Sequence, residues 1–382
     1  MVFFHALRGP GKVRRESCHV RRLNVPLPKV GHYQSWALAS LLPPAVDYAV
    51  FHSGWFGDED SNPLRTNKMN PLTTRRDFLR TTAAASAGLL LSNPARAAKN
   101  RSVLLFTKSS GFEHAVIKTS PGNPSIAETA IRGFSARYKF DLTASKDGRL
   151  FDSKEFHDYA AVVFFTTGDL TQAGTDGQPP MSAEGKQAFL DAIQNGLGFV
   201  GIHAASDTFH TPPDPQDLSN RYIAHGEQSD PYLRMLGGEF IIHGQAKDPR
   251  LQTANVIIND SKFPGLEGVQ SPVSLMEEWY SMKDFAPDLH VICTLDTSTM
   301  NGLAYKRAPY PVVWARMNGR GRVFYNAIGD RAENWQNPFH LNLLAGGIRW
   351  AMGDASASVS PNLKSAAPGY AEIPPPYPPP AK

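Results

Sequence analysis

Short apolar runs alternate with amphipathic segments in the first half of the region that begins near residue 102. Ser102–Thr107 is a continuous apolar run that ends at a glycine-bearing loop, which is typical of a buried parallel strand. Ile126, Ile131 and Phe134 share one face of a predicted helix, for which Asn123-Pro124 offers an N-cap and a first turn. The same patterns predict strands at Phe140–Ala144, Ala160–Thr166 and Gly198–Ile202, and a helix that Ser182 caps and that runs through Asn195.

The pattern changes after residue 238, where strand-like segments follow one another without a long helix between them. Asn318-Gly319 is a strong two-residue hairpin signal, and a last helix is predicted at Asn337–Met352. We therefore expect a three-layer α/β sandwich of the flavodoxin type, with a mostly parallel central sheet and added antiparallel strands in the C-terminal half. The added strands are predicted at Phe240–Ile242, Thr253–Ile258, Val273–Tyr280, His290–Leu295, Val312–Met317 and Arg322–Ala327.

Composition supports a globular protein and narrows the possible chemistry. Of the 382 residues, 41% are hydrophobic and 19% are charged, which is enough apolar material for a sizeable core. The chain has two cysteines, Cys18 and Cys293. This number excludes a disulfide framework and any zinc or iron–sulfur site built from cysteines alone.

The positive net charge of the chain belongs to its N-terminal part. Residues 1–98 carry 13 Lys and Arg against 6 Asp and Glu, whereas the remainder carries 26 basic and 29 acidic residues. The slightly acidic remainder therefore gives no electrostatic reason to expect nucleic acid as a partner.

The N-terminal part contains a pattern of export signals. Thr74–Arg80 resembles a twin-arginine signal, the apolar stretch Ala83–Leu91 follows it, and Ala95-Arg96-Ala97 fits signal-peptidase cleavage before Ala98. The apolar stretch is too short to span a membrane, so stable membrane insertion is not expected. We expect recognition by the twin-arginine export machinery and a periplasmic or secreted protein.

These signals divide the chain into four parts. Residues 1–68 are expected to be a disordered over-extension upstream of a start at Met69, and residues 69–98 the signal peptide. Residues 99–353 are expected to form the α/β domain. Residues 354–382 end in a proline-rich segment, which predicts a disordered tail or a linker.

Three loops follow predicted parallel strands and carry polar side chains. Because ligands bind at the carboxyl ends of such strands, we expect His114, Asp169, His203 and Asp207 to line one cleft. A single loop histidine is more often a solvated or capping residue, and only the joint placement of His114 and His203 favours function.

The segment around His203 has the spacing of a sharp turn from strand to helix. Gly201 and Ala205 are small enough for an elbow that presents the central side chain beside backbone N–H groups. An imidazole at this place could act as general base, general acid, metal ligand or nucleophile. The alternative is a helix start whose small residues serve packing.

The region from Ser102 to about Gly353 resembles the ThuA-like family, named for trehalose utilisation. The resemblance implies a fold related to that of the class I glutamine amidotransferases. It departs from the family pattern at Asp330, where we expect a histidine. The matching segments are Gly111–His114, Gly198–Ala205, Leu236–Phe240 with His243, Glu277–Tyr280, Pro311–Trp314, Gly319–Val323, Gly329–Arg331, Trp335 and Gly346–Trp350.

Amidotransferase chemistry is not expected from this resemblance. It requires a cysteine thiolate at the elbow, where this chain has His203. Cys293 lies in an apolar strand and is predicted to be buried and inert. The protein is therefore not expected to hydrolyse glutamine through a thioester.

A segment that combines two carboxylates with two aromatic residues, Glu277–Tyr280, suits the recognition of sugars. Carboxylates accept hydrogen bonds from hydroxyl groups, and aromatic faces pack on the C–H side of a sugar ring. The alternative is an alternating strand in which only one glutamate faces the cleft. His243 could join His114 and His203 in a zinc-type divalent metal site, although no close histidine spacing supports a metal requirement.

We therefore expect an exported protein that acts on a small sugar, a glycoside or a keto-sugar derivative, as a hydrolase or lyase. His203 and His114 would exchange protons with the substrate, assisted by Glu278. The alternative is a non-catalytic carbohydrate-binding or assembly protein. Substrate contacts are expected from Phe112, Glu113, Asp169, Asp207, Trp279, Tyr280, His243 and Asp330.

The export signal leads to a direct prediction. Changing Arg75→Lys together with Arg76→Lys should hold the protein in the cytoplasm, because the receptor reads paired guanidinium groups. Cell fractionation measures the result, and undiminished periplasmic protein from the double variant would contradict the signal assignment.

Overall fold

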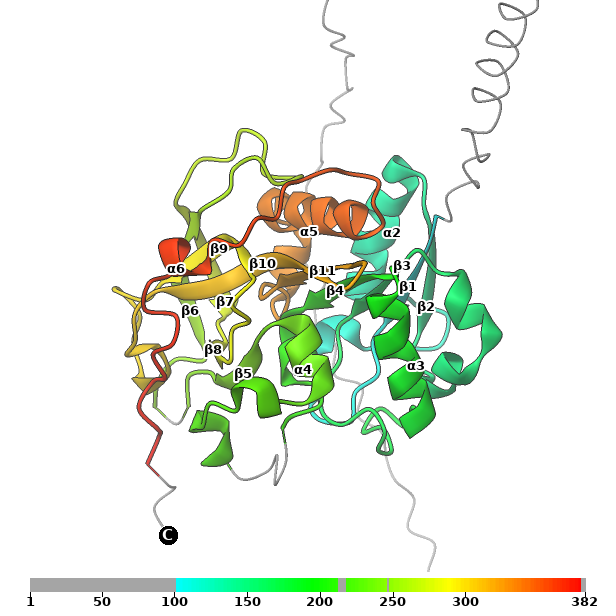
Figure 1. Ribbon diagram of the computed structural model, residues 1–382, viewed down its shortest axis with the longest axis horizontal. Coiled ribbons are helices and arrows are strands. Elements are labelled where there is room, and N and C mark those ends of the chain that lie inside the picture. Colours follow the sequence, from blue (N-terminus) through cyan, green and yellow to red (C-terminus); the bar gives the residue numbers. More distant parts are fainter. Residues whose placement is uncertain (1–100, 212–217, 246, 379–382) are drawn as a thin grey trace, which may run out of the picture. The chain divides into compact units, whose positions relative to one another are not determined.

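The computed structural model describes residues 101–211, 218–245 and 247–378. The segments 1–68 and 69–98, and with them the export signal, lie outside these residues. The described residues form a nine-stranded sheet in the order β2-β1-β3-β4-β11-β10-β9-β6-β7 (Figure 1). Its strands are β1 (Ser102–Phe106), β2 (Asp141–Ser145), β3 (Ala161–Phe164), β4 (Gly198–Ile202), β6 (Leu251–Ile258), β7 (Val273–Glu278), β9 (His290–Asp296), β10 (Tyr310–Asn318) and β11 (Gly321–Asn326).

The pairing of neighbouring strands changes from parallel to antiparallel in the middle of the sheet. The neighbours from β2 to β11 pair in parallel, and those from β11 to β7 pair antiparallel. The expected fold class, a largely parallel α/β sheet with antiparallel strands added by the C-terminal half, is confirmed. The continuous apolar runs of β1 and β3 are explained by burial, because Val103–Phe106 and Ala161–Phe164 are almost completely inaccessible to solvent.

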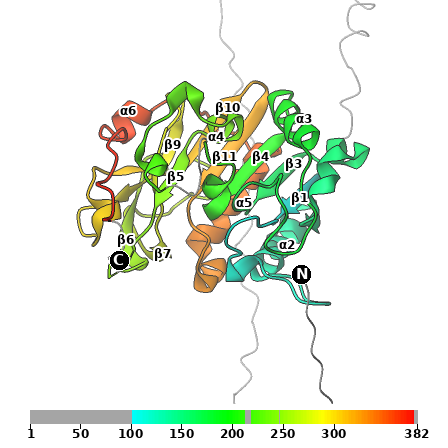
Figure 2. The same cartoon turned by 90° about the horizontal axis from the view of Figure 1, so that it is seen from below.

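Helices cover both faces of the parallel half. Figures 1 and 2 show α2 (Ile126–Tyr138) and α5 (Pro338–Ala351) on one face, and α3 (Ala183–Gln194) and α4 (Pro231–Leu236) on the other. Among the described residues, no helix has both the length and the apolar character that a membrane span requires.

The predicted N-cap of α2 and the predicted hairpin turn between β10 and β11 both exist, but each lies one or two residues from its predicted position. Ser182 caps α3 as predicted, whereas Ser125 and not Asn123 caps α2, where its Oγ accepts from the Glu128 amide at 3.1 Å. The hairpin between β10 and β11 turns at Gly319-Arg320, because Asn318 still pairs with Gly321. Gly319 takes the left-handed conformation that this turn requires, with φ of 60°.

A small separate sheet lies beside the central one. It pairs β5 (Glu239–Ile242) with β8 (Ser281–Lys283) in antiparallel fashion. The predicted strand at Val273–Tyr280 therefore ends earlier, at Glu278, and the chain then crosses from the edge of the large sheet to the small one. Trp279 and Tyr280 form this crossing.

The segment 354–378, expected to be disordered, packs against the domain instead. The side chain of Asn362 accepts from the backbone N–H of Val291 at 2.6 Å and donates to its carbonyl at 3.0 Å. Leu363, in the short α6 (Leu363–Ala366), is buried beside β9 (Figure 2). The Tyr377 hydroxyl donates to Asp248 at 2.8 Å. Proline content was thus a poor guide, because a few polar and apolar contacts are enough to hold this segment.

The Asn362 contacts predict the effect of a single substitution. Asn362→Ala leaves two backbone groups of Val291 without these partners, so the free energy of unfolding should fall by about 1–3 kcal/mol. Chemical denaturation measures the change. The exposed Ser356→Ala in the same segment is the control and should leave stability within ~0.5 kcal/mol. Equal stability of both variants and the parent would show that the segment contributes nothing to folding.

Candidate functional site

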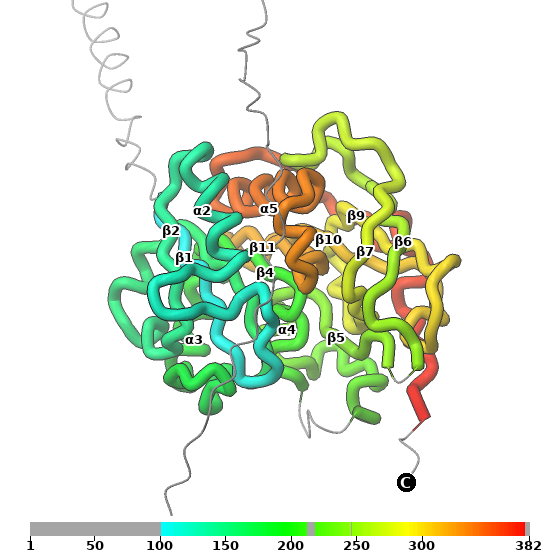
Figure 3. The backbone as a smooth tube through the Cα atoms, turned by 180° about the vertical axis from the view of Figure 1, so that it is seen from behind, coloured from blue at the N-terminus to red at the C-terminus, as the bar shows by residue number. Residues whose placement is uncertain are grey.

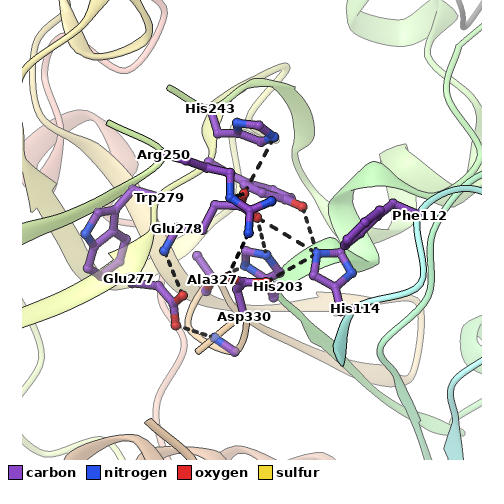
Figure 4. Close-up of polar contacts among 12 residues, drawn as sticks. Phe112, His114, His203, His243, Arg250, Glu277, Glu278, Trp279, Ala327 and Asp330 are labelled. Carbon is purple, nitrogen blue, oxygen red and sulfur yellow. Dashed lines mark hydrogen bonds and ion pairs between the residues drawn. The ribbon is translucent and has the colours of Figure 1, made fainter. Parts of the chain in front are cut away.

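Four polar side chains from distant parts of the sequence meet at the carboxyl ends of the parallel strands (Figure 4). His114 comes from the loop after β1, His203 directly follows β4, Glu278 ends β7, and Asp330 lies in the loop after β11. One nitrogen or oxygen atom from each lies within 4.8 Å of those from the other three. The sequence predicted that His114 and His203 share one site, and the structure brings them together.

His203 occupies a strained elbow of the kind predicted. Its φ is 44°, a left-handed value that is uncommon for a residue with a side chain. Small neighbours make this turn possible, since a Cβ atom at Gly201 would lie 3.2 Å from that of Ala205, and one at Gly329 would lie 3.2 Å from that of His203. The Tyr325 hydroxyl donates to the His203 carbonyl at 2.7 Å and holds the elbow in place.

The ring of His203 is fully buried and lines neither of the two cavities described below. Its Nδ1 donates to the carbonyl of Ala327 at 2.9 Å, and its Nε2 lies 3.3 Å from Oε2 of Glu278. His203 therefore stands behind the side chains that line the first cavity, and Glu278 is the one that its Nε2 contacts. This placement differs from the expectation of a ring exposed at the tip of the elbow.

The carboxylate of Glu278 is the shared partner of the site. Its Oε2 faces His203 and, at 3.9 Å, Nε2 of His114, whereas its Oε1 lies 3.0 Å from Nε of Arg250 and 3.6 Å from Nε2 of His243. Burial by itself would raise the pKa of Glu278. The hydrogen bonds and charges of the surrounding imidazoles outweigh burial and hold this pKa far below its usual range. Glu278 is therefore a buried carboxylate that stays ionised.

The two histidines of the site have pKa values shifted in opposite directions. Burial lowers the pKa of His114 and favours its neutral form. Burial opposes the charged form of His203 as well, but its hydrogen bond to Glu278 and the charge of that carboxylate outweigh burial and raise the pKa of His203. The ring centroids lie only 5.0 Å apart. These shifts favour a neutral His114 beside a protonated His203, and neighbouring groups whose pKa values are pushed apart are typical of acid/base pairs.

Only one of the two adjacent glutamates faces the cavity. Glu277 points to the other side, where its carboxylate accepts from the amide of Gly329 and from the side chain of Asn334, both at 2.9 Å. Burial raises the pKa of Glu277. Glu277 therefore supports the loop that carries Asp330 and lines neither of the two cavities described below.

A first cavity of about 290 Å³ opens above Glu278. Tyr280 lines it and places its hydroxyl 3.4 Å from Nε2 of His114. Trp279 does not line it, because its ring is fully buried and its Nε1 donates to the carbonyl of Gln252. The exposed aromatic residue at this cavity is Phe112, of which 62% is accessible. Trp279 is thus no sugar platform, and Phe112 is the ring available for that role.

The other predicted contact residues are spread over a larger area. Asp169 lines a second cavity of about 560 Å³, and Asp207 lines both cavities. Asp330 lies 3.9 Å from Nε2 of His114. Glu113 forms an ion pair with Lys146 at 3.0 Å and lines neither cavity, which removes the support for a substrate contact.

Several site residues were not predicted. Arg250 lies across the carboxylates of Glu278 and Asp330 (Figure 4). His210 is held between two carboxylates: its Nε2 donates to Asp207 and its Nδ1 to Glu239 at 3.0 Å. Although burial lowers the pKa of His210, the two carboxylates raise it overall. His210 follows the elbow by only seven residues, a proximity that could have drawn attention to it.

The group formed by His114, His203, Glu278 and Asp330 could hold a metal ion. Two imidazoles and two carboxylates are donors that divalent transition metals accept. His243, expected as a third imidazole ligand, is not part of this group. Cys293 is buried and its pKa is raised by burial, so it is an inert thiol, as predicted.

Comparison with known proteins identifies the family. Similar solved structures include a putative ThuA-like protein from Bacteroides uniformis, with a TM-score of 0.47 and 19% identity over 68% of this chain and 95% of that one. Another, from Parabacteroides merdae, has a TM-score of 0.46 and 16% identity over 71% and 98% of the two chains. No protein with a curated description matches the chain. The model of the family described as trehalose utilisation, ThuA, matches residues 102–351, and this chain therefore belongs to the ThuA family.

Proposed function

We propose that this protein is a sugar-active enzyme that cleaves a glycoside or a keto-sugar derivative by proton transfer. The observation that supports it most is the position of Glu278, an ionised carboxylate that faces a cavity on one side and the charged imidazole of His203 on the other. This arrangement stores a proton next to a substrate site. The family's description, trehalose utilisation, supports a sugar as the substrate class.

Each residue has a distinct part in the proposed reaction. His114, neutral and facing the cavity, takes a proton from the substrate or from an attacking water. The proton starts on Nε2 of His203; Glu278 accepts it and passes it to the departing glycosidic oxygen, so Glu278 is a carboxylate before and after the step. In a keto sugar, removal of the proton next to the carbonyl and loss of the glycosidic oxygen give elimination. In a simple glycoside, the same groups serve hydrolysis. In both cases one proton is taken up and one is released.

The fate of the protein in the cell is part of this proposal. We propose export through the twin-arginine pathway, on the grounds of the Arg75-Arg76 pair and the signals that follow it. The substrate would then be a periplasmic or extracellular glycoside.

The proposed proton transfer predicts a loss of turnover in a nearly isosteric variant. Glu278→Gln should lower the rate of sugar release from a panel of glycosides and keto-glycosides at least ~100-fold, the lower bound for an acid/base group. Mass spectrometry of the released sugars measures it. Unfolding should also become easier by about 1–3 kcal/mol, because His203 loses its charged partner.

Glu113→Gln is the matched control for this variant. Glu113 lies in the loop next to His114 but lines neither cavity, so its substitution should leave turnover unchanged. Unchanged turnover in Glu278→Gln would contradict the proposed chemistry. Sugar binding without turnover by the unaltered protein would favour the non-catalytic carbohydrate-binding alternative.

A second candidate is chemistry assisted by a divalent metal in the same four residues. The contact that favours it is the hydrogen bond from Nδ1 of His203 to the Ala327 carbonyl, since a backbone acceptor at one ring nitrogen directs the other toward a ligand. A bound cation would polarise an oxygen atom of the substrate, and His114, His203, Glu278 and Asp330 would hold it.

Metal binding should appear as a gain in thermal stability. At a concentration about 100 times the Kd, Zn²⁺ or Mn²⁺ should stabilise the native protein by about 2.7 kcal/mol, measured by thermal unfolding after dialysis against chelator. The double variant His114→Gln with Asp330→Asn should lose this gain, whereas the exposed His157→Gln should keep it. The absence of any stabilisation in the unaltered protein would exclude this second candidate.

A further inference from the structure

The two cavities of the site adjoin each other. The second cavity, about 560 Å³, is nearly twice as large as the first, and Phe112, Asp207 and Arg221 line both. Its other walls come from the loop after β3, which carries Asp169, and from helix α3, which carries Lys186. A ligand in the first cavity could therefore extend past these shared side chains into the second.

Ion pairs and hydrogen bonds hold the polar residues of the wall that the two cavities share. Asp207 is held by His210 and, at 3.3 Å, by Arg221. Both ring nitrogens of His210 donate to carboxylates, so the ring has no lone pair left for a proton or a metal.

The second cavity offers groups that hydrogen-bond to hydroxyls. Asp169 is exposed, and one of its carboxylate oxygens meets only a long contact of 3.4 Å from Gln172. Lys186 donates to Asp230 at 2.7 Å, and its ammonium, which also lies 4.0 Å from the centre of the Phe209 ring, carries further N–H groups. The charges of the acidic and basic side chains that line this cavity nearly cancel. Such a cavity suits an uncharged polyhydroxylated ligand better than an anion.

Phe112 stands at the junction and is the most exposed large apolar side chain among the described residues, at 62%. Its ring is nearly perpendicular to that of His114, at a centroid distance of 5.1 Å, and most of the side chain stays accessible to a ligand. An apolar ring next to two polar cavities is covered well by the C–H face of a sugar ring, whose hydroxyls then point outward to the polar walls.

We propose that the second cavity is the binding site for the second, non-reacting sugar unit of a two-unit glycoside. The reacting unit occupies the first cavity above Glu278, and Phe112 packs on the unit beyond the linkage. Asp169 and the Lys186–Asp230 pair bind its hydroxyls. This inference rests on the proposed function, because it assigns the first cavity to the reacting sugar.

The test compares one-unit and two-unit ligands that resist cleavage. Isothermal titration calorimetry of the full chain is carried out with methyl glucosides and with sulfur-linked disaccharides of glucose. We expect at least one disaccharide to bind at least ~10-fold more tightly than the methyl glucosides. Asp169→Asn should remove most of this advantage and leave the affinity for methyl glucosides unchanged, because Asp169 lines only the second cavity. Phe112→Ala should weaken the binding of the disaccharide more than that of the methyl glucosides.

Two matched controls separate the site from general effects of substitution. Asp158→Asn changes an exposed carboxylate that lines neither cavity, and Met317→Ala removes an exposed apolar side chain from β10, so both should keep the advantage. Equal affinity for one-unit and two-unit ligands, equal losses for both in the Asp169 and Phe112 variants, or binding of neither ligand would overturn the inference. The proposed function fails on a different result, unchanged turnover in Glu278→Gln, which leaves the disaccharide advantage intact.

Discussion

The buried carboxylate of Glu278 is the constraint on which the organisation of the site depends. An ionised carboxylate removed from water costs several kcal/mol unless cations and hydrogen-bond donors surround it. Here His203 at 3.3 Å, His114 at 3.9 Å and Arg250 at 3.0 Å supply them, each from a different segment of the chain. The position of one anion therefore depends on the correct folding of at least three loops, and each loop is held in turn by that anion.

The antiparallel half of the sheet is what brings this carboxylate to the elbow. In the strand order β7 is at one end and β4 lies in the parallel half, and Figure 3 shows β6 and β7 on the far side from β1 and β2. Two contacts bridge the halves: the Glu277 carboxylate binds the amide of Gly329, and the Asn334 side chain donates to the same carboxylate. Because Gly329 also packs against His203, the loop after β11 connects the elbow to the end of β7. The added strands thus complete the site and do not merely extend the sheet.

The sequence allowed the parallel half and its histidines to be predicted, but much less of the other half. The ends of parallel strands meet at one edge whatever the details of packing, so His114 and His203 could be placed together from strand order alone. Arg250 and Glu239 could not, because the pairing of antiparallel strands depends on register and on a second sheet that no periodicity revealed. Trp279 was expected to contact a sugar because it stands beside two carboxylates, yet β7 ends at Glu278 and the crossing to β8 buries this ring.

The elbow itself shows how the same backbone geometry can serve a different purpose. A strained turn at the end of a strand usually exposes its central side chain, and strain of this kind persists only where the surroundings hold it. In this chain the turn at φ 44° directs the imidazole inward, where Nδ1 meets the carbonyl of Ala327 and Nε2 meets Glu278. A cysteine or serine side chain is too short to make both contacts at once, because only a ring with two nitrogen atoms spans them. The elbow then acts as the source of a buried positive charge, and the group presented to the cavity is the carboxylate that this charge keeps ionised.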